Sequence, residues 1–302
     1  MTLLELLEEL ANSLEQSDCY YGHGTDNPQD EALYIAVETL NLDYASVHQY
    51  FDQTIDEGLR LEAEKIVRQR IESRLPAAYL LGKAYFAGLC FKIDERALVP
   101  RSPIAELIHR KFSPWLASSQ LAQELPLQIL DMCTGSGCIG IAAGLAIPNS
   151  RVTLCDLSAD ALALANENIA VHELAERCLV KLGNGLEAVA DDRSNPCYDL
   201  VLCNPPYVDN EDLAMMPAEY HHEPALGLGS GKDGLDFTRQ FLLQLPQYIH
   251  DDTVIVLELG NTQEAFFEQF AHLHCVQAEL ENGGHGVLII MGEDLCSFIQ
   301  KR

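Results

Sequence analysis

The sequence predicts an α/β protein in which a mostly parallel sheet follows a helical N-terminal segment. Up to about residue 80, apolar residues recur at helical spacing with charged residues between them. From about residue 126 onward, short apolar runs alternate with helical segments, which is typical of a parallel sheet covered by helices on both faces. We therefore expect a helical N-terminal domain over residues 1–83, a linking hairpin over 84–100 and an α/β domain over 101–302.

The N-terminal elements follow from periodicity and breaker residues. Residues 1–10 are apolar with three glutamates and no basic residue, which predicts an amphipathic helix and argues against a secretory signal. Residues 31–40 and 55–75 have the same helical spacing. The loop expected at 21–28 ends in Asn-Pro, a pair suited to starting the next helix.

Several short apolar runs predict the strands of the sheet. A helix is expected after the second of them, over 158–170, and another strand before Gly183. Residues 276–291 predict two antiparallel strands joined through Asn282-Gly-Gly284. The remaining expected strands are 127–131, 151–156, 198–203 and 253–259.

Composition limits the class of protein. The 48% hydrophobic content fits a globular core, and the absence of an apolar run of eighteen residues argues against a membrane span. The ten cysteines are scattered without a Cys-x-x-Cys pair, which predicts reduced thiols rather than a metal site or a disulfide framework. We expect a cytoplasmic protein.

The charge balance argues against a nucleic-acid partner. The chain has 46 acidic and 19 basic residues and a net charge of −27, without a basic patch to neutralise phosphates. A basic protein partner would instead be attracted. The acidity can also serve solubility alone.

A glycine-rich turn between the first strand and its helix predicts a nucleotide site. Gly135-x-Gly137-x-x-Gly140 can present backbone N–H groups at a helix N-terminus. Asp156, at the end of the next strand, can accept hydrogen bonds from ribose hydroxyls. These two features suit NAD and S-adenosylmethionine equally, and a purely structural turn also fits them.

Asp131, four residues before Gly135, favours S-adenosylmethionine. Its carboxylate would repel a pyrophosphate and attract a cationic methionyl group. The alternative is an aspartate that caps the turn.

Asn204-Pro205-Pro206-Tyr207 directly follows the strand expected at 198–203. Ligands of open α/β sheets bind beyond the carboxyl ends of the strands. The Asn204 side chain and the Pro205 carbonyl can accept the two hydrogens of a planar NH2 group while Tyr207 packs on its face. Such positioning assists methyl transfer to a poorly nucleophilic nitrogen. A rigid turn without a ligand is the structural alternative.

Further candidates flank these motifs. Asn184 follows a strand and contacts the adenine or serves as a turn residue. Tyr220 and Glu223 can shape the substrate entrance, whereas His221 and His222 fit a solvated surface pair better than catalytic bases.

Asp131-x-x-x-Gly-x-Gly together with Asn204-Pro-Pro-Tyr207 resembles the protein N(5)-glutamine methyltransferases over nearly the whole chain. The resemblance implies a seven-stranded Rossmann-like methyltransferase domain, S-adenosylmethionine as cofactor and an N-terminal domain for substrate recognition. It implies that Asn204, Pro205 and Tyr207 bind the glutamine side chain, and we place Pro206 with them. The expected cofactor-binding residues are Asp131, Cys133, Thr134, Gly135, Ser136, Gly137, Asp156, Asn184 and Asn204.

Three stretches resemble the branch of this family that modifies the third protein of the large ribosomal subunit: residues 21–28, 99–108 and 219–224. The release-factor branch usually has Pro-Arg-Pro-x-Thr-Glu where this chain has Ser102, Ile104 and Ala105 in place of the second proline, threonine and glutamate. The aromatic residue that often stacks near the adenine is replaced by Gly185.

The predicted function is therefore methylation of a glutamine side-chain amide in a basic ribosomal protein, without direct nucleic-acid or membrane binding. The alternatives are release-factor glutamine methylation, adenine N6 methylation of nucleic acid, an NAD-dependent oxidoreductase and a non-catalytic S-adenosylmethionine-binding module.

Overall fold

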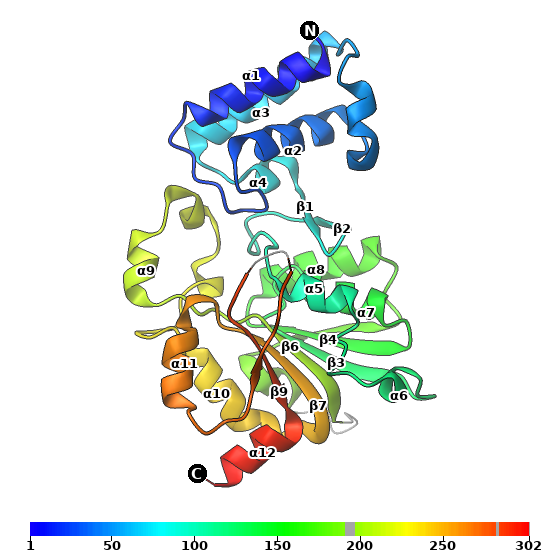
Figure 1. The fold of residues 1–302 in the computed structure, drawn as a ribbon, viewed down its shortest axis with the longest axis vertical. Coiled ribbons are helices and arrows are strands. Elements are labelled where there is room, and N and C mark those ends of the chain that lie inside the picture. Colours follow the sequence, from blue (N-terminus) through cyan, green and yellow to red (C-terminus); the bar gives the residue numbers. More distant parts are fainter. Residues whose placement is uncertain (191–196, 282–283, 302) are drawn as a thin grey trace.

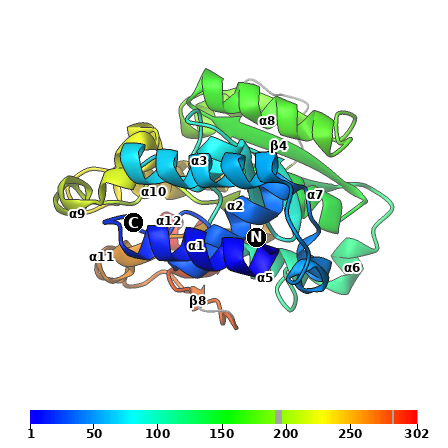
Figure 2. The same cartoon turned by 90° about the horizontal axis from the view of Figure 1, so that it is seen from above.

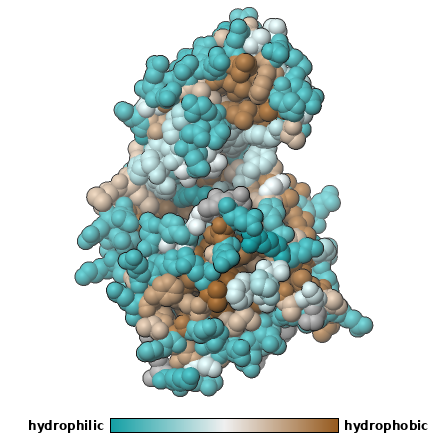
Figure 3. Space-filling view, in the orientation of Figure 1, coloured by the Kyte–Doolittle hydropathy of each residue, from teal (hydrophilic) through white to brown (hydrophobic). Residues whose placement is uncertain are grey.

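The computed structural model describes residues 1–190, 197–281 and 284–301 and arranges them as two lobes, a helical N-terminal lobe and an α/β lobe (Figure 1). The C-terminus lies at the end of the α/β lobe farthest from the N-terminal lobe. The face seen in Figure 3 is mostly hydrophilic and is indented between the lobes. In the described part of the chain, no helix has the length and apolar character needed to cross a membrane.

The N-terminal lobe packs its helices around a core of aliphatic side chains. The first helix is amphipathic, as predicted: Leu3, Leu6, Leu10 and Leu14 are buried, and Thr2 forms a capping box with Glu5 at its start. The first and third helices lie side by side (Figure 2). The elements are α1 (Leu3–Glu15), α2 (Pro28–Leu40), η1 (Tyr44–Tyr50), α3 (Glu57–Ser73) and α4 (Ala77–Leu81).

A short antiparallel pair links the lobes. Strands β1 (Lys83–Phe86) and β2 (Leu89–Lys92) form it, so the hairpin is shorter than the expected range of 84–100. Residues 93–100 are not strands, and the backbone N–H of Val99 donates to the Glu223 carboxylate, 2.9 Å away, instead of to a neighbouring strand. The hairpin over 84–100 was expected from the alternation of its residues, and this pattern cannot reveal a hydrogen-bond partner that is distant in sequence.

Within the described residues, the main sheet has seven strands in the order β5-β4-β3-β6-β7-β9-β8, which confirms the predicted α/β, Rossmann-like fold. β9 is antiparallel to β7, and β8 is antiparallel to β9, as predicted for the end of the chain. Asn282 and Gly283 of the expected joining turn lie outside the described residues. The strands are β3 (Leu127–Met132), β4 (Ser150–Asp156), β5 (Cys178–Leu182), β6 (Tyr198–Cys203), β7 (Ile249–Glu258), β8 (Val276–Gln277) and β9 (Val287–Met291).

Successive strand residues face opposite sides of the sheet, and each side has its own core. Ile129 and Leu200 pack toward α5, α7 and α8, whereas Leu130 and Val201 pack toward α10, α11 and α12. The helices of this lobe are α5 (Ile104–His109), α6 (Ser118–Leu121), α7 (Cys138–Ala146), α8 (Ala159–Val171), α9 (Asn210–Met215), α10 (Asp236–Gln244), α11 (Gln263–Gln269) and α12 (Gly292–Gln300). The short 3-10 helices are η2 (Gly185–Val189), η3 (Ala218–His222), η4 (Ala225–Gly227), η5 (Leu245–Gln247) and η6 (Gly260–Thr262).

The strand order reverses at β3, which lies between β4 and β6. Met132, at the end of β3, is in register with Cys155 of β4 and Cys203 of β6. The segments that follow these three strands therefore leave the sheet beside one another, at the place where ligands bind in folds of this kind.

Candidate functional site

A pocket of about 920 Å³ lies at these strand ends. It is lined by the glycine loop after β3, by Asp156 at the end of β4 and by the Asn204–Tyr207 turn after β6. The structure thus brings together motifs that are more than 70 residues apart in sequence, from Cys133 to Asn204. Of the predicted site residues, those that line this pocket are Cys133, Thr134, Gly135, Ser136, Asp156, Asn184, Asn204, Pro205, Pro206 and Tyr207.

Backbone conformation shapes the glycine loop. Cys133, Gly135 and Gly137 have φ values of 61°, 55° and 82°, and Gly137 is the N-cap of α7. The loop therefore turns tightly from the strand into the helix and directs the helix N-terminus toward the pocket side. A hydrogen bond with Cys203, together with burial, raises the pKa of the Cys133 thiol, which disfavours a nucleophilic role.

Asp131 lies behind this loop, fully buried, and does not itself line the pocket. Its Oδ2 accepts hydrogen bonds from the Thr134 hydroxyl and from the Gly140 N–H, the latter at 2.9 Å. A Cβ on Gly140 would lie 2.9 Å from the Asp131 Cβ, so only glycine admits this approach. Burial outweighs these hydrogen bonds and raises the pKa of Asp131 to about 7.

The second carboxylate oxygen of Asp131 is the observation that bears on a cofactor. Among the described residues, Oδ1 is buried without a hydrogen-bond partner. A buried acceptor without a donor is unfavourable, and a positive charge placed nearby would stabilise the ionised carboxylate. The carboxylate behind the pocket-lining loop therefore suits a cationic group in the pocket, such as the methionyl end of S-adenosylmethionine.

Asp156 is fixed by backbone donors and remains at the pocket wall. Its Oδ2 accepts from the Gly135 N–H and its Oδ1 from the Ser158 N–H, both at 2.8 Å. Each oxygen keeps a further lone pair for a ligand hydroxyl. The neighbouring Leu157 lines the pocket with 50% of its surface exposed, although its type predicts burial. A carboxylate beside an exposed apolar side chain suits an adenosine, with ribose on the former and base on the latter.

Phe237 of α10 was missed by the sequence analysis. It lines the pocket, and its ring lies 3.7 Å from the position that a Cβ on Gly185 would occupy. An aromatic face is thus present beside Asn184 and Gly185, although it comes from a helix distant in sequence. No local motif marks this residue, because only the fold brings α10 to η2.

The Asn204–Tyr207 turn presents free acceptors. Asn204 is partly exposed, and within the described residues nothing donates a hydrogen bond to its side-chain amide oxygen or to the Pro205 carbonyl. Tyr207 is oriented through its hydroxyl, which donates to Glu258 Oε1 at 3.0 Å. Gly260 permits this ring position, because a Cβ there would lie 2.4 Å from the ring.

Glu258, at the end of β7, is a second residue that the sequence analysis missed. It is 4% exposed and accepts hydrogen bonds from Tyr207 and from the Ser102 hydroxyl, the latter at 2.5 Å. Burial raises the pKa of Glu258. The carboxylate thereby holds Tyr207 in the pocket wall and gives Ser102 a partner at a position where the sequence suggested no role.

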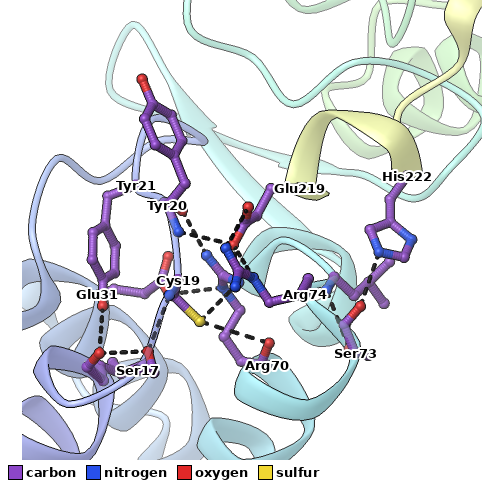
Figure 4. Close-up of polar contacts among 12 residues, drawn as sticks. Ser17, Cys19, Tyr20, Tyr21, Glu31, Arg70, Ser73, Arg74, Glu219 and His222 are labelled. Carbon is purple, nitrogen blue, oxygen red and sulfur yellow. Dashed lines mark hydrogen bonds and ion pairs between the residues drawn. The ribbon is translucent and has the colours of Figure 1, made fainter. Parts of the chain in front are cut away.

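Two buried glutamates connect the segment after the turn to the rest of the molecule. Glu219 is fully buried and accepts from Arg70 Nη1 at 3.0 Å and from Arg74 Nε at 2.7 Å (Figure 4). Burial alone would raise its pKa, but the hydrogen bonds from Arg74, the Tyr20 N–H and Arg70 lower the pKa to about 2. Arg70 also donates to the buried Glu31. The N-terminal lobe therefore contacts the segment after the Asn204–Tyr207 turn through ion pairs.

Glu223 makes the second connection. It accepts from Arg101 Nη1 at 2.6 Å and from Arg101 Nη2 at 2.7 Å. His23 Nε2 lies 3.4 Å from Glu223 Oε2, without the geometry of a hydrogen bond. Burial would raise the pKa of Glu223, but His23 and Arg101 lower it to about 2. The guanidinium of Arg101 also lies 5.3 Å from the centre of the Tyr220 ring.

His221 and His222 lie outside the lining of the pocket. His222 contacts the carbonyl of Ser73 at 2.9 Å, and His221 is exposed (Figure 4 shows His222). Neither residue lines the pocket. Tyr220 between the glutamates does line it, at the side of Arg101.

Comparison with known proteins agrees with this geometry. The model of the family Methyltransferase small domain matches residues 115–220, a range that holds both the glycine loop and the Asn204–Tyr207 turn. The ribosomal protein uL3 glutamine methyltransferase of Francisella tularensis subsp. tularensis is 37% identical over 301 residues, covering 98% of this chain and 92% of that protein. The protein of the same name from Bordetella pertussis is 38% identical over 297 residues, covering 97% and 96%.

Among solved structures, the catalytic domain of hMettl16 in complex with the MAT2A 3'UTR hairpin 1 has a TM-score of 0.51 at 15% identity, with 85% of this chain and 88% of that chain covered. At this identity the likeness concerns the fold alone. The relatives, by contrast, match almost from end to end. With this identity over nearly its whole length, and with a glycine loop and an Asn-Pro-Pro-Tyr turn in one pocket, the chain belongs to the family of ribosomal protein uL3 glutamine methyltransferases.

Proposed function

We propose that this protein transfers the methyl group of S-adenosylmethionine to the side-chain amide nitrogen of a glutamine in ribosomal protein uL3. The observation that carries the proposal is the single pocket, which joins the glycine loop and Asp156 to the Asn204–Tyr207 turn. The names of the two relatives support uL3 as the substrate.

In this proposal the cofactor occupies the β3–β4 side of the pocket and supplies an electrophilic sulfonium methyl group. Asp131 would attract its cationic end electrostatically from behind the glycine loop, and Asp156 would accept from the ribose hydroxyls. Asn184 and Phe237 flank the adenine. Residues Cys133 to Gly137 form the turn that lets the backbone approach the cofactor closely.

The glutamine amide binds at the end of β6. The Asn204 side-chain oxygen and the Pro205 carbonyl would accept its two hydrogens and fix the plane of the amide, which leaves one face of the nitrogen open to methyl transfer. Pro205 and Pro206 make the turn rigid, and Tyr207, held by Glu258, packs on the planar amide. The contribution of these residues is orientation: methyl transfer would break the S–CH3 bond and release the demethylated cofactor, and the methylated nitrogen would lose one proton to water.

The function is tested by incubating the purified protein and labelled S-adenosylmethionine with uL3 and, separately, with a peptide-chain release factor. We expect label on one glutamine of uL3, located by mass spectrometry of peptides. Label on the release factor alone would contradict the choice of substrate, and absence of label on both would contradict the function.

A further inference from the structure

Tyr20 belongs to the N-terminal lobe and yet lines the pocket of the α/β lobe. Its side chain is 45% exposed, and its ring centre lies 5.9 Å from that of Tyr220, which lines the same pocket. Arg101 lies 5.3 Å from the centre of the Tyr220 ring, and the next residue, Ser102, donates to the same Glu258 carboxylate as Tyr207. Tyr20 and Tyr220 are therefore on the side of the pocket that holds the Asn204–Tyr207 turn, not on the side of the glycine loop.

The backbone of Tyr20 is fixed from both directions. Its N–H donates to Glu219 Oε1 at 2.9 Å, and its carbonyl accepts from Arg70 Nη2 at 2.8 Å (Figure 4). Glu219 and Arg70 are 0% and 1% exposed, and they also bind each other. Breaking a buried ion pair on one side is strongly destabilising, so the fold depends on these contacts. The result is an exposed aromatic ring whose backbone is hydrogen-bonded to two buried side chains.

The same pocket has a further exposed side chain that suits contact with a polypeptide. Met215, which also lines the pocket, is 79% exposed, and the helix α9 that carries it has no buried residue. Exposed aromatic and methionine side chains at the rim of a cavity are typical of recognition surfaces. A glutamine within a protein enters the pocket together with its neighbouring residues, so the rim has to accommodate a chain rather than a free amino acid.

We propose that Tyr20 packs against the uL3 segment beside the methylated glutamine and determines substrate specificity, with Glu219 and Arg70 as the residues that position it. This inference rests on the proposed function and adds the part of the N-terminal lobe that contacts the substrate.

Steady-state kinetics of the full chain with labelled cofactor and uL3 test the role of the ring. We expect Tyr20→Ala to raise the KM for uL3 about tenfold, because a packed aromatic ring is lost, with kcat and the KM for the cofactor little changed. Tyr20→Phe keeps the ring and should behave like the unmodified protein. Tyr44→Ala is the matched control, since Tyr44 is a 37% exposed tyrosine of the same lobe that does not line the pocket.

A double-mutant cycle tests the positioning role. Glu219→Gln should raise the KM for uL3, and Tyr20→Ala combined with Glu219→Gln should be no worse than the more impaired single variant, because both act through one ring. Cofactor affinity of each variant, measured by calorimetry, confirms that the pocket remains folded.

Each outcome has a distinct meaning. If the unmodified protein methylates uL3 while Tyr20→Ala leaves its KM unchanged, the specificity role is wrong. Additive effects in the double variant would remove the positioning role of Glu219. Failure of the unmodified protein to methylate uL3 would instead contradict the proposed function.

Discussion

At the scale of single residues, we expect methyl transfer to depend most on the Asn204 side chain. It stands at the end of β6 with its amide oxygen free of protein donors among the described residues. We expect Asn204→Ala to lower kcat/KM by about 100-fold, since one of two orienting acceptors is lost, while cofactor affinity changes little. Kinetics with uL3 and calorimetry with the cofactor measure the two effects. Asn166→Ala, at an exposed site on α8, is the control, and near-normal activity of Asn204→Ala would refute the role.

Asp131 predicts a pH dependence of cofactor binding. Its pKa is about 7 because it is buried, so the carboxyl is largely protonated at pH 6. A cationic ligand group favours the ionised form, and affinity should therefore increase as the pH rises from about 5.5 to about 7.5. Calorimetric titration over this range measures the change.

Asp131→Asn is the control for this dependence, because it keeps the size and removes the titration. The variant should bind more weakly at pH 7.5 and show a flatter profile. An equally steep profile in the variant would assign the pH dependence to another group.

The sequence predicted the residues of the pocket that belong to local motifs. Asp156, the glycine loop and Asn204–Tyr207 each stand at or directly after the end of a recognisable strand, and strand ends of a parallel sheet meet at one edge. Phe237, Glu258 and Tyr20 were not predicted, because their place in the pocket depends on helix packing, on the neighbouring strand and on the other lobe. Their types and sequence neighbours carry no mark of a site.

At the scale of elements, η3 is connected to the N-terminal lobe through the hydrogen bonds that Glu219 accepts from Arg70 and Arg74. The pKa of Glu219 is lowered from 4.5 to about 2 by its donors. A lowered pKa stabilises the folded state above pH 4.5, and this stabilisation is lost as the pH falls toward 2. We expect Glu219→Gln to be less stable at neutral pH and to lose less stability than the unmodified protein on acidification.

Urea unfolding followed by circular dichroism at several pH values measures this difference. Glu211→Gln on the exposed helix α9 is the matched control and should follow the unmodified protein. Parallel stability curves for Glu219→Gln and the unmodified protein would show that the ion pair contributes nothing to acid sensitivity.

Periodicity predicted most elements, including β3, β4 and α8 beside the glycine loop. It did not predict where the linking hairpin ends. Residues 93–100 alternate like a strand, yet the Val99 N–H bonds to the Glu223 carboxylate. The stretch 219–224 was recognised only as a resemblance. The stretch supplies two buried carboxylates that pair with Arg70, Arg74 and Arg101. These pairs become visible only in the three-dimensional structure.

At the scale of the whole molecule, the net charge of −27 predicts electrostatic steering of a basic substrate. We expect kcat/KM for uL3 to fall about threefold or more between about 0.05 and 0.3 M salt, because screening slows association. A short neutral glutamine peptide is the control and should show little change. Salt-independent kinetics with uL3 would rule out steering, and the acidity would then serve solubility alone.

The sequence did not predict how the two lobes are placed relative to each other. Their separate natures were predictable from the change of periodicity between residues 80 and 126. Their relative placement depends on Arg70 of α3 reaching Glu219 of η3, a contact across 149 positions of sequence. The sequence around Arg70 does not indicate that Glu219 is its partner, and the sequence around Glu219 does not indicate Arg70.

This contact also constrains the evolution of the chain. Replacing Arg70 alone would leave the buried Glu31 without its ion-pair partner, and replacing Glu219 alone would remove a partner of both Arg70 and Arg74, so either change lowers stability. A recombination event that exchanged only the N-terminal segment would therefore lower stability unless the incoming segment supplied its own cation at the same place. The N-terminal segment and the segment around η3 are in this sense inherited together.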